Sequence, residues 1–179
     1  GNFDFNTKNL AVTDSELVSQ WRNVLRLKTG DTVILCDGKG HEAHGTITNM
    51  DKKGAHVTID EIETPDRDPI KDTTLYCAVL KRENFELVVQ KATEIGIARI
   101  VPLLTERTVK TGFNRERLEK IIREACEQSG RTTLPELSNP LNFSESVENI
   151  KPNEAVLFDL SGSEIASFKP LKLQSCFVG

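Results

Sequence analysis

The sequence predicts an α/β protein with an added β domain at its N-terminus. Three observations lead to this fold class. Residues 31–64 alternate apolar and polar side chains, residues 65–72 are rich in proline and charge, and strand-like and helix-like segments alternate after residue 73. The first pattern indicates antiparallel strands, and the last indicates a mostly parallel sheet with helices on its faces. We therefore assign residues 1–70 to a β domain and residues 71–179 to an α/β domain.

The first domain opens with a predicted helix within the segment 14–31. Asp14 or Thr13 can cap its start, and Gly30 follows its end. The apolar face of this helix carries Leu17, Trp21, Val24 and Leu25. Three strands are predicted after it: "TVILC" before an Asp-Gly turn, "HEAHGTITNM", and "AHVTIDEIE" after the turn "DKKG". One short helix with a few antiparallel strands is typical of a small β-barrel.

The second domain alternates strands with helices. Strands are predicted at "TTLYCAVL" (73–80), "ARIVPLL" (98–104), "LPEL" (134–137), "EAVLFDL" (154–160) and "KLQSCFVG" (172–179). Helices are predicted at 83–96, 114–130 and, more briefly, 142–150. Ligands of parallel sheets bind at the carboxyl ends of strands. The segments to examine are therefore 81–84, 105–108, 159–162 and whatever follows Gly179.

Composition narrows the class of protein. Apolar residues make up 37% and charged residues 28% of the 179 positions, as in globular proteins. No run of about 18 apolar residues is present, so we expect no membrane span. The four cysteines form no CxxC pair and lie in apolar segments, which predicts reduced core thiols and a cytoplasmic protein. The net charge of −4 resides in residues 1–70, which hold 8 Lys/Arg and 12 Asp/Glu, because residues 71–179 hold 15 of each.

Several catalytic motifs are missing. The sequence contains no Walker A loop, GxGxxG, GxSxG or HExxH. His41 and His44 lie near Cys36, but on an alternating strand the two histidines point to opposite faces, so we predict no metal site. A Ser–His–acid triad has no support, since every histidine lies in the β domain.

Two groups of residues remain as site candidates. Arg107 follows a predicted buried strand at its carboxyl end, where a guanidinium can hold a phosphate; a solvated loop charge is the alternative. Glu124, Gln128 and Arg131 form one stripe at the end of the helix 114–130. We expect this stripe to be half-buried, and it is either one wall of a site or a structural ion pair.

Several stretches, taken in order, resemble one family. They are "NVLRLKTGD" (23–31), "ELVVQKATEIGIARIVPL" (86–103), "TERTV" (105–109), "REACEQSGR" (123–131) followed by "LPEL", and the terminal "FVG". The resemblance is to the bacterial small-subunit (16S) ribosomal RNA uridine-N3 methyltransferases of the knotted SPOUT superfamily, and it spans nearly the whole chain. Ser19 and Gln20 stand where members of that family carry a pair of histidines.

The resemblance implies a PUA-like β-barrel for RNA binding, a SPOUT methyltransferase domain, S-adenosylmethionine as methyl donor, ribosomal RNA as partner and a homodimer. It makes the stripe and Arg107 the expected catalytic residues: Arg107, Glu124, Gln128 and Arg131. The expected cofactor contacts are Phe158, Asp159, Val178 and Gly179. The expected RNA contacts are Arg22, Arg26, Lys91 and Arg107.

The same family continues after "FVG" with a Pro-Glu-Gly-Gly turn and the segment that threads the knot. We therefore expect the 179-residue chain to be a fragment, with a partial cofactor pocket and no methyltransferase activity by itself. Two other function classes remain open from the residues alone. One is a non-enzymatic RNA-binding module, and the other is an unrelated small-molecule α/β enzyme.

Overall fold

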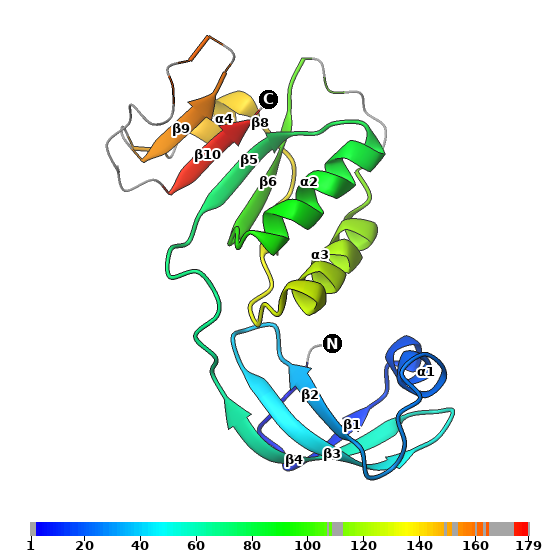
Figure 1. Cartoon of the computed structure of the whole chain (residues 1–179). Helices are drawn as coiled ribbons and strands as arrows, with labels where there is room; N and C mark the ends of the chain where they lie inside the picture. The colour runs from blue at the N-terminus through cyan, green and yellow to red at the C-terminus, as the bar shows by residue number, and fades with distance from the viewer. Residues whose placement is uncertain are drawn as a thin grey trace. The chain divides into compact units, whose positions relative to one another are not determined.

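The computed structural model describes residues 3–106, 108, 113–148, 150–151, 154–159, 161–162, 164 and 174–178. The chain divides into two compact units, Gly1–Asp68 and Pro69–Gly179 (Figure 1). The first contains an antiparallel sheet and the second a parallel sheet with helices, which confirms the predicted fold class. None of the described helices combines the length and apolar character that a membrane crossing requires.

The sheet of the first unit has the strand order β1-β4-β3-β2 and is antiparallel throughout. The bounds are β1 Asn9–Val12, β2 Thr32–Cys36, β3 Glu42–Met50 and β4 Ala55–Glu63. The three later strands lie where the alternating pattern predicts them, whereas β1 was not predicted. Alternate residues such as Val12, Ile47 and Val57 point into the core of this unit.

Helix α1 (Ser15–Asn23) is shorter than predicted. Its expected extension to Gly30 is wrong, because the chain leaves the helix at Asn23 and Arg26 takes a left-handed conformation with φ 57°. The amide of Leu27 then donates to the carbonyl of Trp21 (2.9 Å), a bond that closes the helix end. Val24 and Leu25 consequently lie outside the helix and are exposed.

Asp14 caps α1, as predicted. Its carboxylate accepts hydrogen bonds from the amides of Glu16 (3.0 Å) and Leu17 (3.1 Å). We predict that Asp14→Ala lowers the free energy of unfolding of the first unit by about 1 kcal/mol, because both amides lose their acceptor. Urea unfolding followed by the fluorescence of Trp21, the single tryptophan, measures this. Asp14→Ser serves as the control that keeps an acceptor, and equal midpoints for the alanine variant and the parent would contradict the prediction.

The second unit contains a parallel sheet with the order β7-β6-β5-β10-β9, and β8 also pairs with β6. The bounds are β5 Thr74–Ala78, β6 Arg99–Leu104, β7 Glu136–Leu137, β8 Leu141–Asn142, β9 Ala155–Phe158 and β10 Ser175–Val178. The chain builds outward from β5 to β6 and β7, then returns to place β10 and β9 on the other side of β5. The order therefore reverses between β5 and β10, which is the position where open α/β sheets bind ligands.

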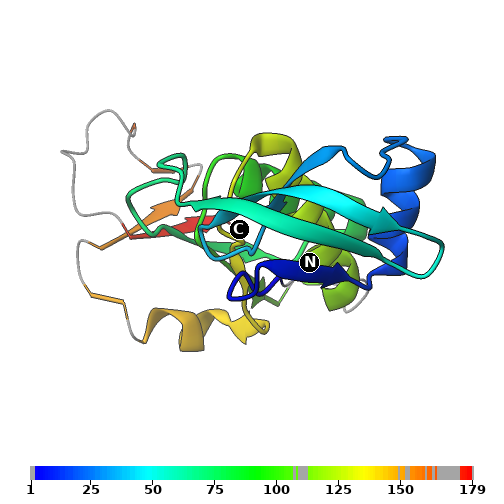
Figure 2. The ribbon, with the colours of Figure 1, turned by 90° about the horizontal axis from the view of Figure 1, so that it is seen from below.

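Helices cover both faces of this sheet (Figures 1 and 2). Helices α2 (Arg82–Glu94) and α3 (Arg115–Ser129) pack on the face that carries Cys77 and Ile100. The short helix α4 (Phe143–Val147) lies on the opposite face, where the ring of Phe143 meets that of Phe177 edge-on at 6.0 Å. The helices end as the sequence indicates, with Gly96 at φ 92° after α2 and Gly130 at φ 70° after α3.

The linker between the units is held at two points. The guanidinium of Arg67 forms an ion pair with the buried carboxylate of Glu42 in the first unit. In the second unit the ring of Pro69 lies so close to Gly96 that a Cβ at Gly96 would be 2.2 Å from its Cγ. Asp68 is the one residue between these two anchors.

All four cysteines are free thiols, as predicted. Cys77 and Cys126 are buried, and Cys36 and Cys176 are partly buried. Burial raises the pKa of the Cys77 thiol to about 11. Burial, together with the neighbouring Glu42 carboxylate, raises the pKa of Cys36 to about 11 as well. These thiols are therefore protonated near neutral pH and are poor nucleophiles.

Candidate functional site at the carboxyl edge of the parallel sheet

The carboxyl ends of β9, β10 and β5 lie side by side. Val178 is paired with Phe158 of β9 and with Cys77 of β5. The structure thus brings Phe158 and Val178, two of the expected cofactor contacts, next to each other, and Asp159 directly follows Phe158. Phe158 is 42% and Val178 43% exposed, so the two side chains form an open apolar surface at this edge. Gly179, the fourth expected contact, lies outside the described residues.

A closed turn follows β9. The Asp159 carboxylate accepts hydrogen bonds from the amide of Ser161 (2.8 Å) and from its hydroxyl. The amide of Gly162 donates to the carbonyl of Asp159 (3.1 Å). The two bonds from Ser161 lower the pKa of Asp159, so its carboxylate is ionised at neutral pH. An ionised, exposed acceptor beside an apolar surface suits the hydroxyl groups of a ribose.

A second turn follows β6. The Thr105 amide donates to the hydroxyl of Thr108 (2.8 Å), and the two hydroxyls lie 3.1 Å apart. The Thr108 amide donates back to the Thr105 carbonyl (2.9 Å), which closes the turn. This turn lies at the carboxyl edge of the sheet. Arg107, an expected catalytic and RNA contact, lies outside the described residues.

An apolar cleft opens on the α4 face of the same sheet. Phe177 stacks on Tyr76, with ring centroids 4.3 Å apart and an interplanar angle of 6°. The cleft has a volume of about 370 Å³. Its walls are formed by Phe143, Val147, Ile150, Lys151, Ala155, Leu157 and Phe177. Sequence reasoning missed this cleft, although Tyr76 and Phe177 occupy matching positions on two predicted strands.

The stripe Glu124, Gln128 and Arg131 differs from its prediction. Half-burial of the stripe is wrong: Glu124 and Gln128 are exposed, and Arg131 is buried with 9% exposure. The reason is Gly130, whose left-handed conformation turns the chain away from the helix before Arg131. One guanidinium nitrogen of Arg131 donates to the carbonyls of Thr93 and Ile97, both at 2.9 Å. Arg131 therefore binds the backbone at the end of α2.

The stripe also lies far along the sheet from the expected cofactor contacts. Helices α2 and α3 both start at the carboxyl edge and run toward the amino edge. Arg131 reaches Thr93 and Ile97, which lead into the amino end of β6, whereas Phe158 and Val178 end their strands. Within one chain the structure does not bring the two groups together.

The expected RNA contacts fall in separate places. Arg22 and Arg26 belong to the first unit, at the end of α1 and in the turn after it, and Arg26 is exposed. Lys91 lies on α2, where its amine forms an ion pair with Glu94 (2.7 Å). That contact is the largest cause of a lowered pKa for the Glu94 carboxyl. The side chains of Arg22, Arg26 and Lys91 are cationic. Arg26 and Lys91 are exposed, and Arg22 is partly exposed.

His41 and His44 have different partners, in line with their predicted separation. His41 pairs with Asp37 (2.8 Å), and His44 pairs with Glu63 (2.9 Å) across β3 and β4. The ligand atoms of Glu42, His44 and Glu63 lie within 4.8 Å of one another, a spacing that suits a cation. The guanidinium of Arg67 already forms an ion pair with Glu42, so these side chains also fit a purely electrostatic network without a bound ion.

Two families match this chain. Residues 66–176 match the RNA methyltransferase domain family, and residues 22–60 match the RNA methyltransferase PUA domain family. A ribosomal RNA small subunit methyltransferase E from Synechocystis sp. is 36% identical over 140 residues, covering 75% of this chain and 45% of that protein. Its namesake from Rickettsia conorii is 32% identical, covering 76% of this chain and 55% of that protein. The chain thus spans about half the length of the relatives it matches.

Solved structures share the fold. A methyltransferase from Legionella pneumophila, solved with bound SAM, superposes with a TM-score of 0.83 at 27% identity over 96% of this chain and 74% of that one. A ribosomal RNA small subunit methyltransferase E from Neisseria gonorrhoeae, bound to S-adenosyl methionine, superposes with a TM-score of 0.84 at 24% identity. The match covers 99% of this chain and 73% of that one. The second likeness concerns the fold alone. Because the domain match covers more than half of its residues, the chain belongs to the RNA methyltransferase family.

Proposed function

We propose that the protein containing this chain transfers a methyl group from S-adenosylmethionine to N3 of a uridine in small-subunit ribosomal RNA. The observation that carries the proposal is the meeting of Phe158, Asp159 and Val178 at the carboxyl edge, beside the reversal of strand order. Family membership and the names of the relatives support the reaction class, and the SAM-bound Legionella pneumophila methyltransferase supports the cofactor.

The residues at this edge fit the cofactor. Phe158 and Val178 offer an exposed apolar surface for the adenine ring, and the ionised Asp159 can accept hydrogen bonds from ribose hydroxyls. When bound, the cofactor supplies a methyl group that its positive sulfur already activates. The protein then has to position the uridine, which can contribute about 7–11 kcal/mol for a well-oriented pair.

Uracil N3 carries a weakly acidic proton that must leave before or during methyl transfer. Glu124 is the candidate to accept this proton, and Gln128 is the candidate to bind the uracil edge. Both side chains are exposed but lie toward the amino edge of the sheet. They reach a cofactor at the carboxyl edge only from a second copy of the protein, so the proposal includes a homodimer. Arg131, being bonded to backbone carbonyls, acts as a positioning residue in this scheme.

Cationic side chains would hold the RNA backbone. Arg22, Arg26, Lys91 and Arg107 are the candidates. Phosphate contacts of this kind weaken as salt concentration rises, because counterions are released on binding. Localisation in the cytoplasm is part of the same proposal, since ribosomal RNA is the substrate.

The test is methyl transfer to small ribosomal subunits that lack the modification, using the full-length protein and radiolabelled S-adenosylmethionine. Nucleoside analysis of the product by mass spectrometry should find 3-methyluridine. A different methylated nucleoside would overturn the N3 assignment. Tight RNA binding without any methyl transfer would instead favour a non-enzymatic RNA-binding module.

Replacement of Asp159 tests the cofactor site directly. We predict that Asp159→Ala weakens S-adenosylmethionine binding about tenfold, because the cofactor loses an ionised acceptor. Isothermal titration calorimetry on the full-length protein measures the dissociation constant. Asp66→Ala, which removes an exposed carboxylate from the linker, is the matched control. An unchanged constant for Asp159→Ala would place the cofactor elsewhere.

A further inference from the structure

The first unit contains a cleft that the proposed reaction does not use. It has a volume of about 630 Å³, within the range of small-molecule sites. We call it the N-terminal cleft. It is lined by Phe3, Asp4, Phe5, Asn6, Asp37, Lys39, His41 and Ile62. All of these residues belong to the unit Gly1–Asp68.

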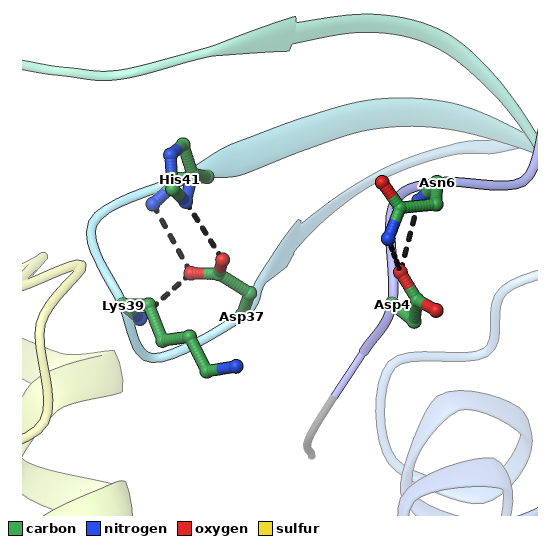
Figure 3. Close-up of polar contacts among 5 residues, drawn as sticks. All are labelled: Asp4, Asn6, Asp37, Lys39 and His41. Atoms are coloured by element: carbon green, nitrogen blue, oxygen red, sulfur yellow. Dashed lines mark hydrogen bonds and ion pairs between the residues drawn. The ribbon is translucent and has the colours of Figure 1, made fainter.

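One wall of the N-terminal cleft is the loop between β2 and β3 (Figure 3). The Asp37 carboxylate accepts hydrogen bonds from the amides of Lys39 (2.7 Å) and His41 (3.1 Å) and binds Nδ1 of the His41 ring (2.8 Å). These bonds fix the loop and the orientation of the imidazole. With Nδ1 committed to Asp37, Nε2 is the ring nitrogen that remains for a ligand. The Lys39 amine extends from the same loop toward the opposite wall.

The opposite wall is the segment before β1. One carboxylate oxygen of Asp4 accepts hydrogen bonds from the Asn6 amide (3.0 Å) and side chain (2.6 Å). Among the contacts between described residues, the second oxygen of Asp4 has no partner and remains an acceptor. Figure 3 shows Asp4 and Asn6 on the segment across from the loop that carries Lys39 and His41.

The remaining lining is apolar and aromatic. The rings of Phe3 and Phe5 lie nearly parallel, with centroids 6.5 Å apart and an interplanar angle of 16°. Both rings are partly buried against the core of the unit, which holds them in place. Ile62 of β4 adds an exposed aliphatic side chain. Flat apolar surfaces of this kind stack against nucleobases.

The cleft thus offers the ammonium of Lys39 and the imidazole of His41 on one wall, a carboxylate on the other, and aromatic rings in its lining. A nucleotide has the complementary chemistry: a phosphate for Lys39, a ribose hydroxyl for Nε2 of His41, a flat base for Phe3 and Phe5, and, in cytosine or adenine, an exocyclic amino group for Asp4. A uracil base presents a carbonyl oxygen at the corresponding position, which a carboxylate would repel. We propose that the N-terminal cleft holds one unpaired cytidine or adenosine of the RNA substrate, separate from the uridine that is methylated. This inference rests on the proposed RNA substrate.

The test compares short single-stranded RNAs that differ at one position. Fluorescence anisotropy with the labelled pentamers UUCUU, UUAUU and UUUUU measures their affinity for the full-length protein. We expect the C- or A-containing pentamer to bind about tenfold tighter than UUUUU, in keeping with one well-placed base contact. Asp4→Asn should remove this difference. Lys39→Gln should weaken binding of all three pentamers and make it less dependent on salt, and His41→Gln should weaken binding of all three.

Matched controls lie on the same unit. Lys53→Gln in the β3–β4 turn and His56→Gln on β4 remove exposed side chains of the same types outside the cleft, and should leave the affinities unchanged. Circular dichroism confirms that each variant is folded. Equal affinity for all three pentamers would overturn the proposal. CMP binding as tightly as UUCUU, with the same sensitivity to Asp4→Asn, would also overturn it and assign the cleft to a free nucleotide.

The outcomes separate this inference from the proposed function. Methyl transfer to the ribosomal subunit without any preference among the pentamers would defeat the inference alone. A preference that depends on Asp4, in a protein that transfers no methyl group, would defeat the proposed function alone.

Discussion

Replacing Arg131 with alanine is expected to lower the free energy of unfolding of the second unit by about 3 kcal/mol. The buried guanidinium donates to the carbonyls of Thr93 and Ile97, and the Thr93 carbonyl, at the end of α2, carries partial negative charge. Alanine would leave both carbonyls without this cationic donor and would open space between α2 and α3. Urea unfolding monitored by far-ultraviolet circular dichroism, which reports mainly on the helices, measures the loss.

Two comparisons make this result specific. Arg131→Lys keeps the charge but replaces a planar fork of donors by one ammonium, so we expect roughly half of the loss. The fluorescence of Trp21 reports on the first unit and should keep its unfolding midpoint in both variants. A normal stability for Arg131→Ala, combined with lost methyl transfer, would show that Arg131 acts on the substrate rather than on the fold.

Replacing Gly96 with alanine is expected to lower the free energy of unfolding by about 3 kcal/mol. Gly96 has φ 92°, a conformation that side chains rarely adopt, and this strain alone costs about 1–2 kcal/mol. The added Cβ would also lie 2.2 Å from Cγ and 3.0 Å from Cδ of Pro69. A proline ring has no rotamer through which to escape, so the linker itself would have to move. Thermal unfolding of the full chain measures the combined effect.

Gly30 provides the matched control. It has φ 98°, yet a Cβ there would meet no atom within 4 Å, so Gly30→Ala carries the strain without the clash. We expect Gly30→Ala to cost about 1–2 kcal/mol. The second substitution Pro69→Ala should recover part of the loss in Gly96→Ala and none in Gly30→Ala. Equal losses for the two glycine variants would show that Pro69 contributes nothing to the effect.

The sequence predicted strands best where alternation was long. β3 and β4 have nine residues each, and their period was clear, whereas β1 has four residues and a partner 43 or more positions away in the chain. The overlong α1 has a similar cause. Val24 and Leu25 continue the apolar face on paper, but Arg26 adopts the left-handed conformation that glycine usually signals.

The candidate site divides in the same way. Phe158 and Val178 could be paired in advance, because the carboxyl ends of neighbouring parallel strands meet at one edge. The environment of Arg131 could not be predicted, because its acceptors are backbone carbonyls about 35 positions earlier in the chain. No side-chain pattern reveals such a contact. The N-terminal cleft escaped prediction for a related reason. It joins the segment before β1 to a loop more than 30 residues later, and β1 itself was not foreseen.

The ion pair between Arg67 and Glu42 makes the attachment of the linker to the first unit dependent on salt. Arg67 attaches the segment after β4 to Glu42 of the first unit, and Pro69 packs on Gly96 within the second unit. If the ion pair opens, residues 64–68, a segment of about 17 Å when extended, lose this attachment to Glu42. Arg67 is about half exposed, so salt weakens the pair. Ionic strength would therefore control whether the segment 64–68 is held against the first unit, independently of its effect on RNA binding.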